Sequence, residues 1–230
     1  MRTPLRLAVA QPLCRSHDVA GNAERHAAAV RAAGARVVVF PELSLTGYEL
    51  EADALNPADT RLAPLVAACA DSGALALAGA PVAGRHIAVL AVDGDGARVA
   101  YRKMWLGGAE SRHFRPGPEP AVLDVDGWRL GLAVCKDTGI PAHAAETVAR
   151  GADAYLAGVL ESADDAAVPE ERASRIATAH EVWVALASFA GATGGGYAQA
   201  AGGSGIWSPD GVAVARAGAG VGDLVTATLH

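Results

Sequence analysis

Apolar residues occur along this chain in short continuous runs, which are typical of strands buried on both faces of a sheet. The first run, Leu5–Gln11, predicts a strand, and the Ala-rich stretch Asn22–Ala33 predicts a helix that ends at Gly34. Three further elements follow: a strand at Arg36–Phe40, a helix at about Leu62–Ser72 and a strand at Ala74–Gly79. This alternation of strands and helices predicts an α/β fold.

Paired strand patterns follow in the rest of the chain. Ile87–Val92 and Ala97–Arg102 flank DGDG, whose residues tolerate positive φ angles, so this pair predicts a β-hairpin. Two more hairpins are predicted around Asp126-Gly127 and SPDG: Ala121–Val125 with Trp128–Val134, and Gly205–Trp207 with Val212–Arg216. Helices are expected at Pro141–Arg150 and Pro169–His180, and DLVTATL predicts a closing strand. This mix predicts two antiparallel-rich sheets covered by helices.

Composition indicates one compact domain. Hydrophobic residues make up 51% of the 230 residues and charged residues 19%, which excludes a disordered chain. No linker divides the sequence and no internal repeat is visible, so residues 1–230 are expected to form a single domain. Gly191–Gly205 comes nearest to low complexity, and it is expected to be a flexible loop that borders the active site.

Charge and cysteine content exclude several classes of partner and cofactor. A net charge of −6 without a basic run gives no footprint for nucleic acid or a membrane surface. The N-terminus is interrupted by Pro4 and Pro12, unlike a signal peptide, so the cytoplasm is the expected location. Cys14, Cys69 and Cys135 form no CxxC pair and the seven histidines no HExxH motif, so neither disulfides, nor a metal, nor a cofactor are expected.

Three apolar strands end in residues that carry chemistry. VVVFPE ends at Glu42, ARVAYRK ends at Lys103, and GLAVC ends at Cys135, so a carboxylate, an amine and a thiol stand at strand ends. Lysine is rare in this chain: of the 19 basic residues, only Lys103 and Lys136 are lysines. An ammonium group is a compact charge with a movable pKa, unlike the guanidinium of arginine, so these positions are expected to need an amine.

The ordered set FPELSLTGY, YRK, ESRHFRPG, GLAVCKD and GGSGIWSPDG resembles the nitrilase, or carbon-nitrogen hydrolase, superfamily. That resemblance implies an α-β-β-α sandwich, which agrees with the two sheets predicted above, and a catalytic triad of Glu42, Lys103 and Cys135. It further implies that Glu110 is a second glutamate of the site, which orients Lys103 or assists proton transfer. It also implies a homo-oligomer of two or more subunits.

The three residues fit one reaction. A thiol is mostly protonated at neutral pH, so Cys135 needs Glu42 as a base or Lys103 as a nearby positive charge. The predicted activity is hydrolysis of a small amide or N-carbamoyl compound at a non-peptide C–N bond, through a cysteine thioester that releases ammonia or an amine. Two alternatives remain: acyl transfer to an amine in place of water, and a catalytically silent member that serves in binding or assembly.

The sequence departs from the family pattern near these motifs. Trp105 follows Met104 where the family commonly has histidine, Lys136 stands where the residue after the cysteine is often aromatic, and Ser188 replaces an asparagine. Lys136 is either a surface amine paired with a carboxylate or a group that binds a substrate carboxylate or lowers the pKa of Cys135. With Tyr48, it is assigned to substrate binding, and the substrate is expected to be a small-molecule amide.

Overall fold

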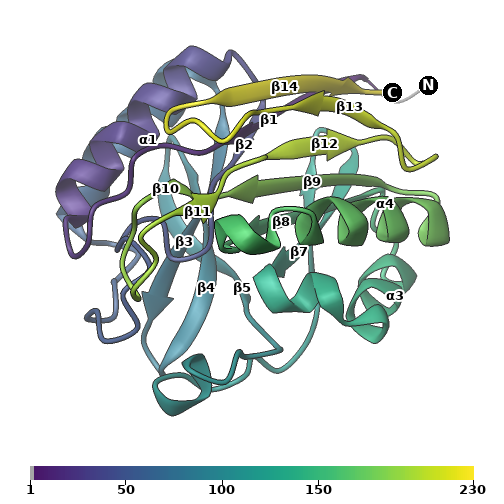
Figure 1. The fold of residues 1–230 in the computed structure, drawn as a ribbon. Coiled ribbons are helices and arrows are strands. Elements are labelled where there is room, and N and C mark those ends of the chain that lie inside the picture. Colours follow the sequence, from purple (N-terminus) through teal and green to yellow (C-terminus); the bar gives the residue numbers. More distant parts are fainter. Residues whose placement is uncertain (1–2) are drawn as a thin grey trace.

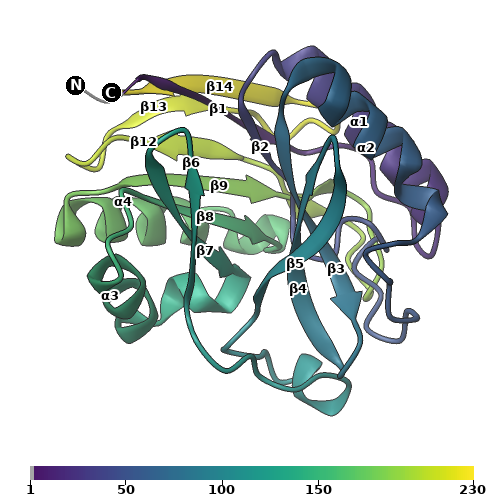
Figure 2. The same cartoon turned by 180° about the vertical axis from the view of Figure 1, so that it is seen from behind.

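A computed structural model describes residues 3–230. Helices α1 and α2 lie on one side of the molecule and α3 and α4 on the other, with two sheets between them (Figures 1 and 2). The helices span Val19–Ala33 (α1), Ala63–Ser72 (α2), Pro141–Ala149 (α3) and Val168–His180 (α4). The predicted α-β-β-α sandwich is therefore confirmed.

The first sheet has the strand order β14-β1-β2-β3-β4-β5. Its strands are β1 Leu5–Ala10, β2 Val37–Val39, β3 Leu75–Val82, β4 His86–Asp93, β5 Gly96–Arg102 and β14 Leu224–Leu229. The pairs β1–β2 and β2–β3 are parallel, while β14–β1, β3–β4 and β4–β5 are antiparallel. The sheet is mixed and largely antiparallel, as predicted.

The second sheet has the order β13-β12-β9-β8-β7-β6 and repeats that pattern. Its strands are β6 Ala121–Val125, β7 Trp128–Val134, β8 Ala154–Val159, β9 Trp183–Ser188, β12 Gly205–Trp207 and β13 Ala213–Arg216. Again the two central pairs, β7–β8 and β8–β9, are parallel and the outer pairs antiparallel. Each sheet thus contains a β-α-β-α-β unit, a repeat of topology that the sequence does not reveal.

Three clusters of apolar side chains fill the spaces between the two sheets and between each sheet and its helices. Along β1 the side chains alternate, so Leu7 and Val9 face the second sheet while Ala8 packs beneath α1 and α2. A similar layer under α3 and α4 contains Ile176 and Tyr155. Because both faces of each sheet are covered, its central strands are continuous apolar runs.

The predicted boundaries differ from the structure in small ways. Helix α1 begins at Val19 rather than Asn22, because the Asp18 side chain accepts a hydrogen bond from the Gly21 N–H and caps it. Its end at Gly34, which has a φ of 52°, is as predicted. The three predicted hairpins are all present. The loop after β9 contains the short pair β10 Ala190–Gly191 and β11 Ala200–Ala201.

Candidate active site

Glu42 is held between the two sheets. Its loop passes Gly79 of β3 on one side and Gly158 of β8 on the other. A Cβ on Gly79 would lie 2.3 Å from the Leu43 nitrogen, and one on Gly158 would lie 2.5 Å from the Phe40 oxygen, so any side chain there would displace the loop. Paired glycines on facing strands therefore let this backbone enter the core.

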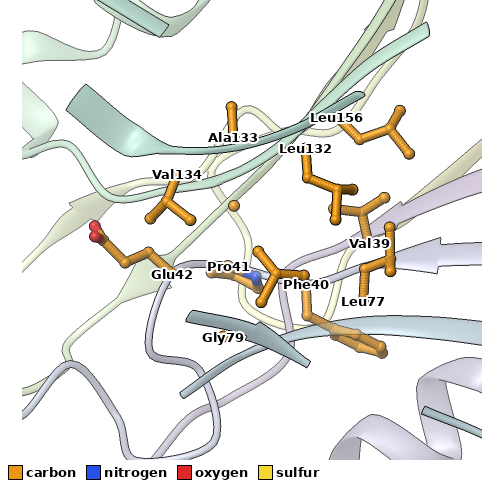
Figure 3. A pocket seen from close by; sticks show the side chains of 12 residues that line it. Val39, Phe40, Pro41, Glu42, Leu77, Gly79, Leu132, Ala133, Val134 and Leu156 are labelled. Carbon is orange, nitrogen blue, oxygen red and sulfur yellow. The ribbon is translucent and has the colours of Figure 1, made fainter. Parts of the chain in front are cut away.

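The carboxylate of Glu42 extends away from an apolar layer. Figure 3 shows Val39, Leu77, Leu132 and Leu156 gathered behind it, around a small cavity to which Glu42 also contributes. The cavity volume is about 10 Å³, room for no more than one water molecule. Apolar contacts thus fix the base of this side chain and leave its carboxylate free to meet other polar groups.

Lys103 joins two carboxylates. It follows β5, is only 1% exposed, and its Nζ lies 2.6 Å from Glu42 Oε1 and 2.8 Å from both carboxylate oxygens of Glu110. Glu110 also accepts hydrogen bonds from the Gly107 N–H at 2.6 Å and from the Tyr48 hydroxyl at 3.1 Å. The ammonium therefore has a fixed position between two buried glutamates.

One oxygen of this cluster has no partner. Within residues 3–230, the buried Glu42 Oε2 makes no hydrogen bond, although Glu42 is 1% exposed. Buried polar atoms are almost always paired, and an unpaired carboxylate oxygen is a costly feature. An unpaired carboxylate oxygen in a cluster of ionisable groups makes Glu42 a candidate for proton transfer.

Cys135 lies at the end of β7, at the start of a turn of 3₁₀-helix formed by Cys135–Gly139. Its φ of 39° is in the left-handed region, which a non-glycine residue seldom adopts and which marks a strained turn. The thiol points to the Leu160 carbonyl, 3.5 Å from Sγ. Glu42, Lys103 and Cys135 lie close enough that each charge acts on the others.

Burial and charge shift the pKa of every group in the cluster. Burial raises the pKa of Glu42 to about 8, with Lys103 opposing the rise and Glu110 adding to it. Burial and the Glu42 carboxylate likewise raise the pKa of the Cys135 thiol. Burial alone would lower the pKa of Lys103, but the nearby acidic groups, Glu42 first and then Cys135 and Glu110, raise it; burial alone would raise the pKa of Glu110, but Lys103 lowers it. The lysine is therefore charged, and Glu110 is its counter-ion.

Both residues assigned to substrate binding have additional contacts. Lys136 is exposed, and its Nζ donates a hydrogen bond to the Leu106 carbonyl at 2.7 Å. Tyr48 is buried, and its ring meets Tyr197 edge-on at 5.5 Å. Tyr197 belongs to the loop after β9, where the Gly194 N–H and the Thr193 hydroxyl bond the Gly47 carbonyl. The glycine-rich loop thus packs on Tyr48, beside the cluster.

Two residues near the cluster were not predicted. Glu161 follows β8, pairs with Arg172 at 2.9 Å and acts electrostatically on Cys135. The sequence does contain a pattern that could have identified Glu161, because AYLAGVLE is another apolar strand that ends in a charged residue. Asp137, fully buried two residues after Cys135, had no distinguishing signal in the sequence.

No metal or membrane feature is found in the described part of the chain. Among residues 3–230, no three or more His, Cys, Asp and Glu side chains are grouped so that they could hold a metal ion. Within the same residues, no helix has the length and apolar character needed to cross a membrane.

Comparisons with solved structures identify the class of protein to which this fold belongs. The fold is that of the nitrilase superfamily, whose amidases are similar to this chain in structure. The NitN amidase from Neterenkonia sp. AN1 has a TM-score of 0.88 and 26% identity, with 98% of this chain and 93% of the amidase covered. A cysteine-to-alanine mutant of the amidase from Nesterenkonia sp. AN1, in complex with butyramide, has a TM-score of 0.88 and 27% identity over 98% of this chain and 90% of its own.

The sequence comparisons then identify the family. A family model for carbon-nitrogen hydrolases matches residues 6–230, and the chain belongs to that family. The "Hydrolase in pqqF 5'region" of Pseudomonas protegens is 30% identical over 93% of this chain and 79% of its own length. A glutamine-dependent NAD(+) synthetase of Xylella fastidiosa is 34% identical over 66% of this chain, which corresponds to only 31% of that protein.

Proposed function

We propose that this protein hydrolyses small amides, or N-carbamoyl compounds, through a thioester on Cys135. Glu42 is the general base, Lys103 the oxyanion donor, and Glu110 the residue that keeps Lys103 charged and oriented. The observation that carries this proposal is the unpaired Oε2 of Glu42, in a carboxyl group bonded to Lys103 and electrostatically coupled to Cys135. A base that faces a thiol needs one free oxygen, and a purely structural ion pair does not.

In the first half-reaction, Glu42 takes the thiol proton as Sγ attacks the amide carbon. The carbonyl oxygen becomes an oxyanion, which accepts hydrogen bonds from the Lys103 ammonium and, as in the family pattern, from the Lys136 backbone N–H. One such preorganised donor contributes about 3–4 kcal/mol. The C–N bond then breaks, the departing amine takes the proton from Glu42, and a thioester remains on Cys135.

In the second half-reaction, Glu42 takes a proton from water as that water attacks the thioester. The second tetrahedral intermediate expels the Cys135 thiolate, which recovers its proton from Glu42, and a carboxylic acid leaves. The raised pKa of Glu42, about 8, suits a group that accepts and returns a proton near neutral pH. Glu110 takes no proton in this scheme, because its lowered pKa keeps it ionised beside Lys103.

Amides are preferred as substrates because of the structural relatives. The amidase from Nesterenkonia sp. AN1 has been solved with butyramide, and with acrylamide added to its active-site cysteine, both small aliphatic amides. Homo-oligomerisation and a cytoplasmic location remain predictions of the sequence.

Ammonia release from a panel of small amides and ureas tests the function. The wild type is expected to release ammonia and carboxylic acid in equal amounts, while Cys135→Ala is inactive. Mass spectrometry after fluoroacetamide treatment should show one adduct, on Cys135. A wild type that reacts with none of the amides and forms no adduct would refute the proposal in favour of a silent protein. Product that forms only when an amine is added would indicate acyl transfer.

A further inference from the structure

Asp137, two residues after the candidate nucleophile, is a buried carboxylate with three hydrogen-bond donors. It is fully buried, and its Oδ2 accepts hydrogen bonds from the Val134 N–H at 2.9 Å and the Tyr101 hydroxyl at 2.8 Å. Its Oδ1 accepts a third, from the Trp105 N–H at 2.9 Å. Burial raises the pKa of this carboxyl group, and the three donors, which favour its charged form, oppose that rise and fix both of its oxygens.

These three bonds connect the two sheets beside the site. Val134 immediately precedes Cys135 at the end of β7, in the second sheet. Trp105 lies two residues after Lys103, in the chain that leaves β5 of the first sheet. One carboxylate group therefore ties the backbone that carries the nucleophile to the backbone that carries the ammonium.

A chain of hydrogen bonds holds Asp137 from behind. His143 Nε2 lies 2.8 Å from the Tyr101 hydroxyl oxygen, and His143 Nδ1 lies 2.8 Å from the Tyr155 hydroxyl. Because an ionised carboxylate only accepts, Tyr101 donates to Asp137 and receives the Nε2–H of His143, whose Nδ1 then accepts from Tyr155. Every bond in this relay has the same direction and ends at the carboxylate, so each strengthens the next.

Stability alone does not explain such a relay. Asp137, His143, Tyr101 and Tyr155 are all nearly inaccessible to solvent, and buried charged groups are often replaced by apolar side chains without loss of stability. A role in positioning Cys135 does explain the relay, since Cys135 has a strained backbone that its surroundings must hold in place.

We propose that Asp137 is a positioning residue, which sets the place of Cys135 relative to Lys103, and that the relay from Tyr155 through His143 and Tyr101 orients its carboxylate. This inference rests on the proposed function, because it assigns Asp137 a part in the same reaction. Asp137 touches neither the thiol nor the ammonium through any hydrogen bond, so it acts through the backbone.

The test is Asp137→Asn, which keeps the shape of the side chain but turns one acceptor into a donor that faces another donor. We expect kcat to fall about 10²-fold, the loss that a displacement of about 1 Å produces, while KM stays within about twofold. Alkylation of Cys135 by iodoacetamide should slow by at least about fivefold, since the thiol is moved from its base. Tyr155→Phe removes only the far end of the relay and should lower kcat by about threefold to tenfold.

A control separates positioning from folding. Leu65→Ala leaves a cavity in α2, in the apolar layer between the first sheet and helices α1 and α2, and is expected to destabilise the protein while leaving kcat and the alkylation rate unchanged. Should Asp137→Asn fail to fold, Tyr155→Phe and Tyr101→Phe carry the test. Variants that lose stability like Leu65→Ala but keep kcat and alkylation within about twofold would overturn the inference. If the wild type hydrolyses no amide, the proposed function fails, and the alkylation rates still decide the role of Asp137.

Discussion

Replacing Lys103 by methionine removes the charge from the centre of the candidate site and keeps the length of the side chain. Lys103 is 1% exposed and bonds Glu42 and Glu110, so the variant leaves two buried carboxyl groups without their shared cation. Loss of one partner from a buried ion pair destabilises a protein by about 3–5 kcal/mol. We expect a loss of that size at about pH 8, together with loss of activity.

The size of this loss depends on pH. In the wild type the pKa of Glu110 lies below its ordinary value of 4.5, so its contribution to stability is present above that pH and disappears as pH falls. In the variant, Glu110 is buried beside Glu42 without a cation, so its pKa rises and the folded state binds a proton that the unfolded state does not. Each pH unit between the two pKa values then changes stability by about 1.4 kcal/mol. The difference from wild type should shrink to about 1–2 kcal/mol near pH 5.

Urea unfolding at about pH 5 and about pH 8 measures both values. Lys136→Met is the matched control, since it makes the same change at the only other lysine, which is exposed and should alter stability by less than about 0.5 kcal/mol. A Lys103→Met variant that is equally destabilised at both pH values would refute the charge argument. One that unfolds like wild type at pH 8 would show that the buried cluster is not ionised as described.

Three further predictions follow from the same geometry. If Glu42 accepts the thiol proton, kcat/KM should rise with pH and level off above about 8, and a profile flat from about pH 5 to about pH 9 would exclude this role. Gly158→Ala forces the Glu42 loop away from β8, so kcat should fall at least about tenfold with little change in KM, whereas the same substitution at the open, solvent-side Gly108 should have no effect. Lys136→Met should remove any preference for ω-amides that carry a free carboxylate, because the Lys136 ammonium donates one hydrogen bond within residues 3–230, to the Leu106 carbonyl, and so keeps two donors for substrate. An unchanged preference, measured as kcat/KM with and without that carboxylate, would show that Lys136 only ties down the loop.

The sequence predicted most of the fold because local pattern and tertiary structure agree along most of the chain. Turn residues such as Asp126-Gly127 mark hairpins that the structure contains, and Gly34 ends the first helix as expected. Burial on both faces makes the central strands uniformly apolar, which identifies strands but not their partners. The repeated topology of the two sheets depends on pairing between distant segments, and no pattern within a short window records it.

The candidate site was predictable only where strand ends carry unusual residues. Glu42, Lys103 and Cys135 stood out by position and, for lysine, by rarity, and the structure brings all three together. Asp137 did not stand out, because an aspartate in a turn after a strand is ordinary in sequence. The role proposed for Asp137 depends on hydrogen bonds from Trp105 and Tyr101, which lie in or after a strand of the other sheet, and such contacts are visible only in three dimensions.

The origin of these residues in different sheets has a mechanical consequence. Glu42 and Lys103 follow strands of the first sheet and Cys135 follows a strand of the second. The distance between base and nucleophile therefore depends on how the two sheets are placed relative to each other. Apolar packing alone tolerates small shifts of one layer over another, since volume matters more to it than register. Directional contacts must therefore fix the register. Close backbone approach at Gly158 does so on the side of Glu42, and the hydrogen bonds of Asp137 do so between Cys135 and Lys103.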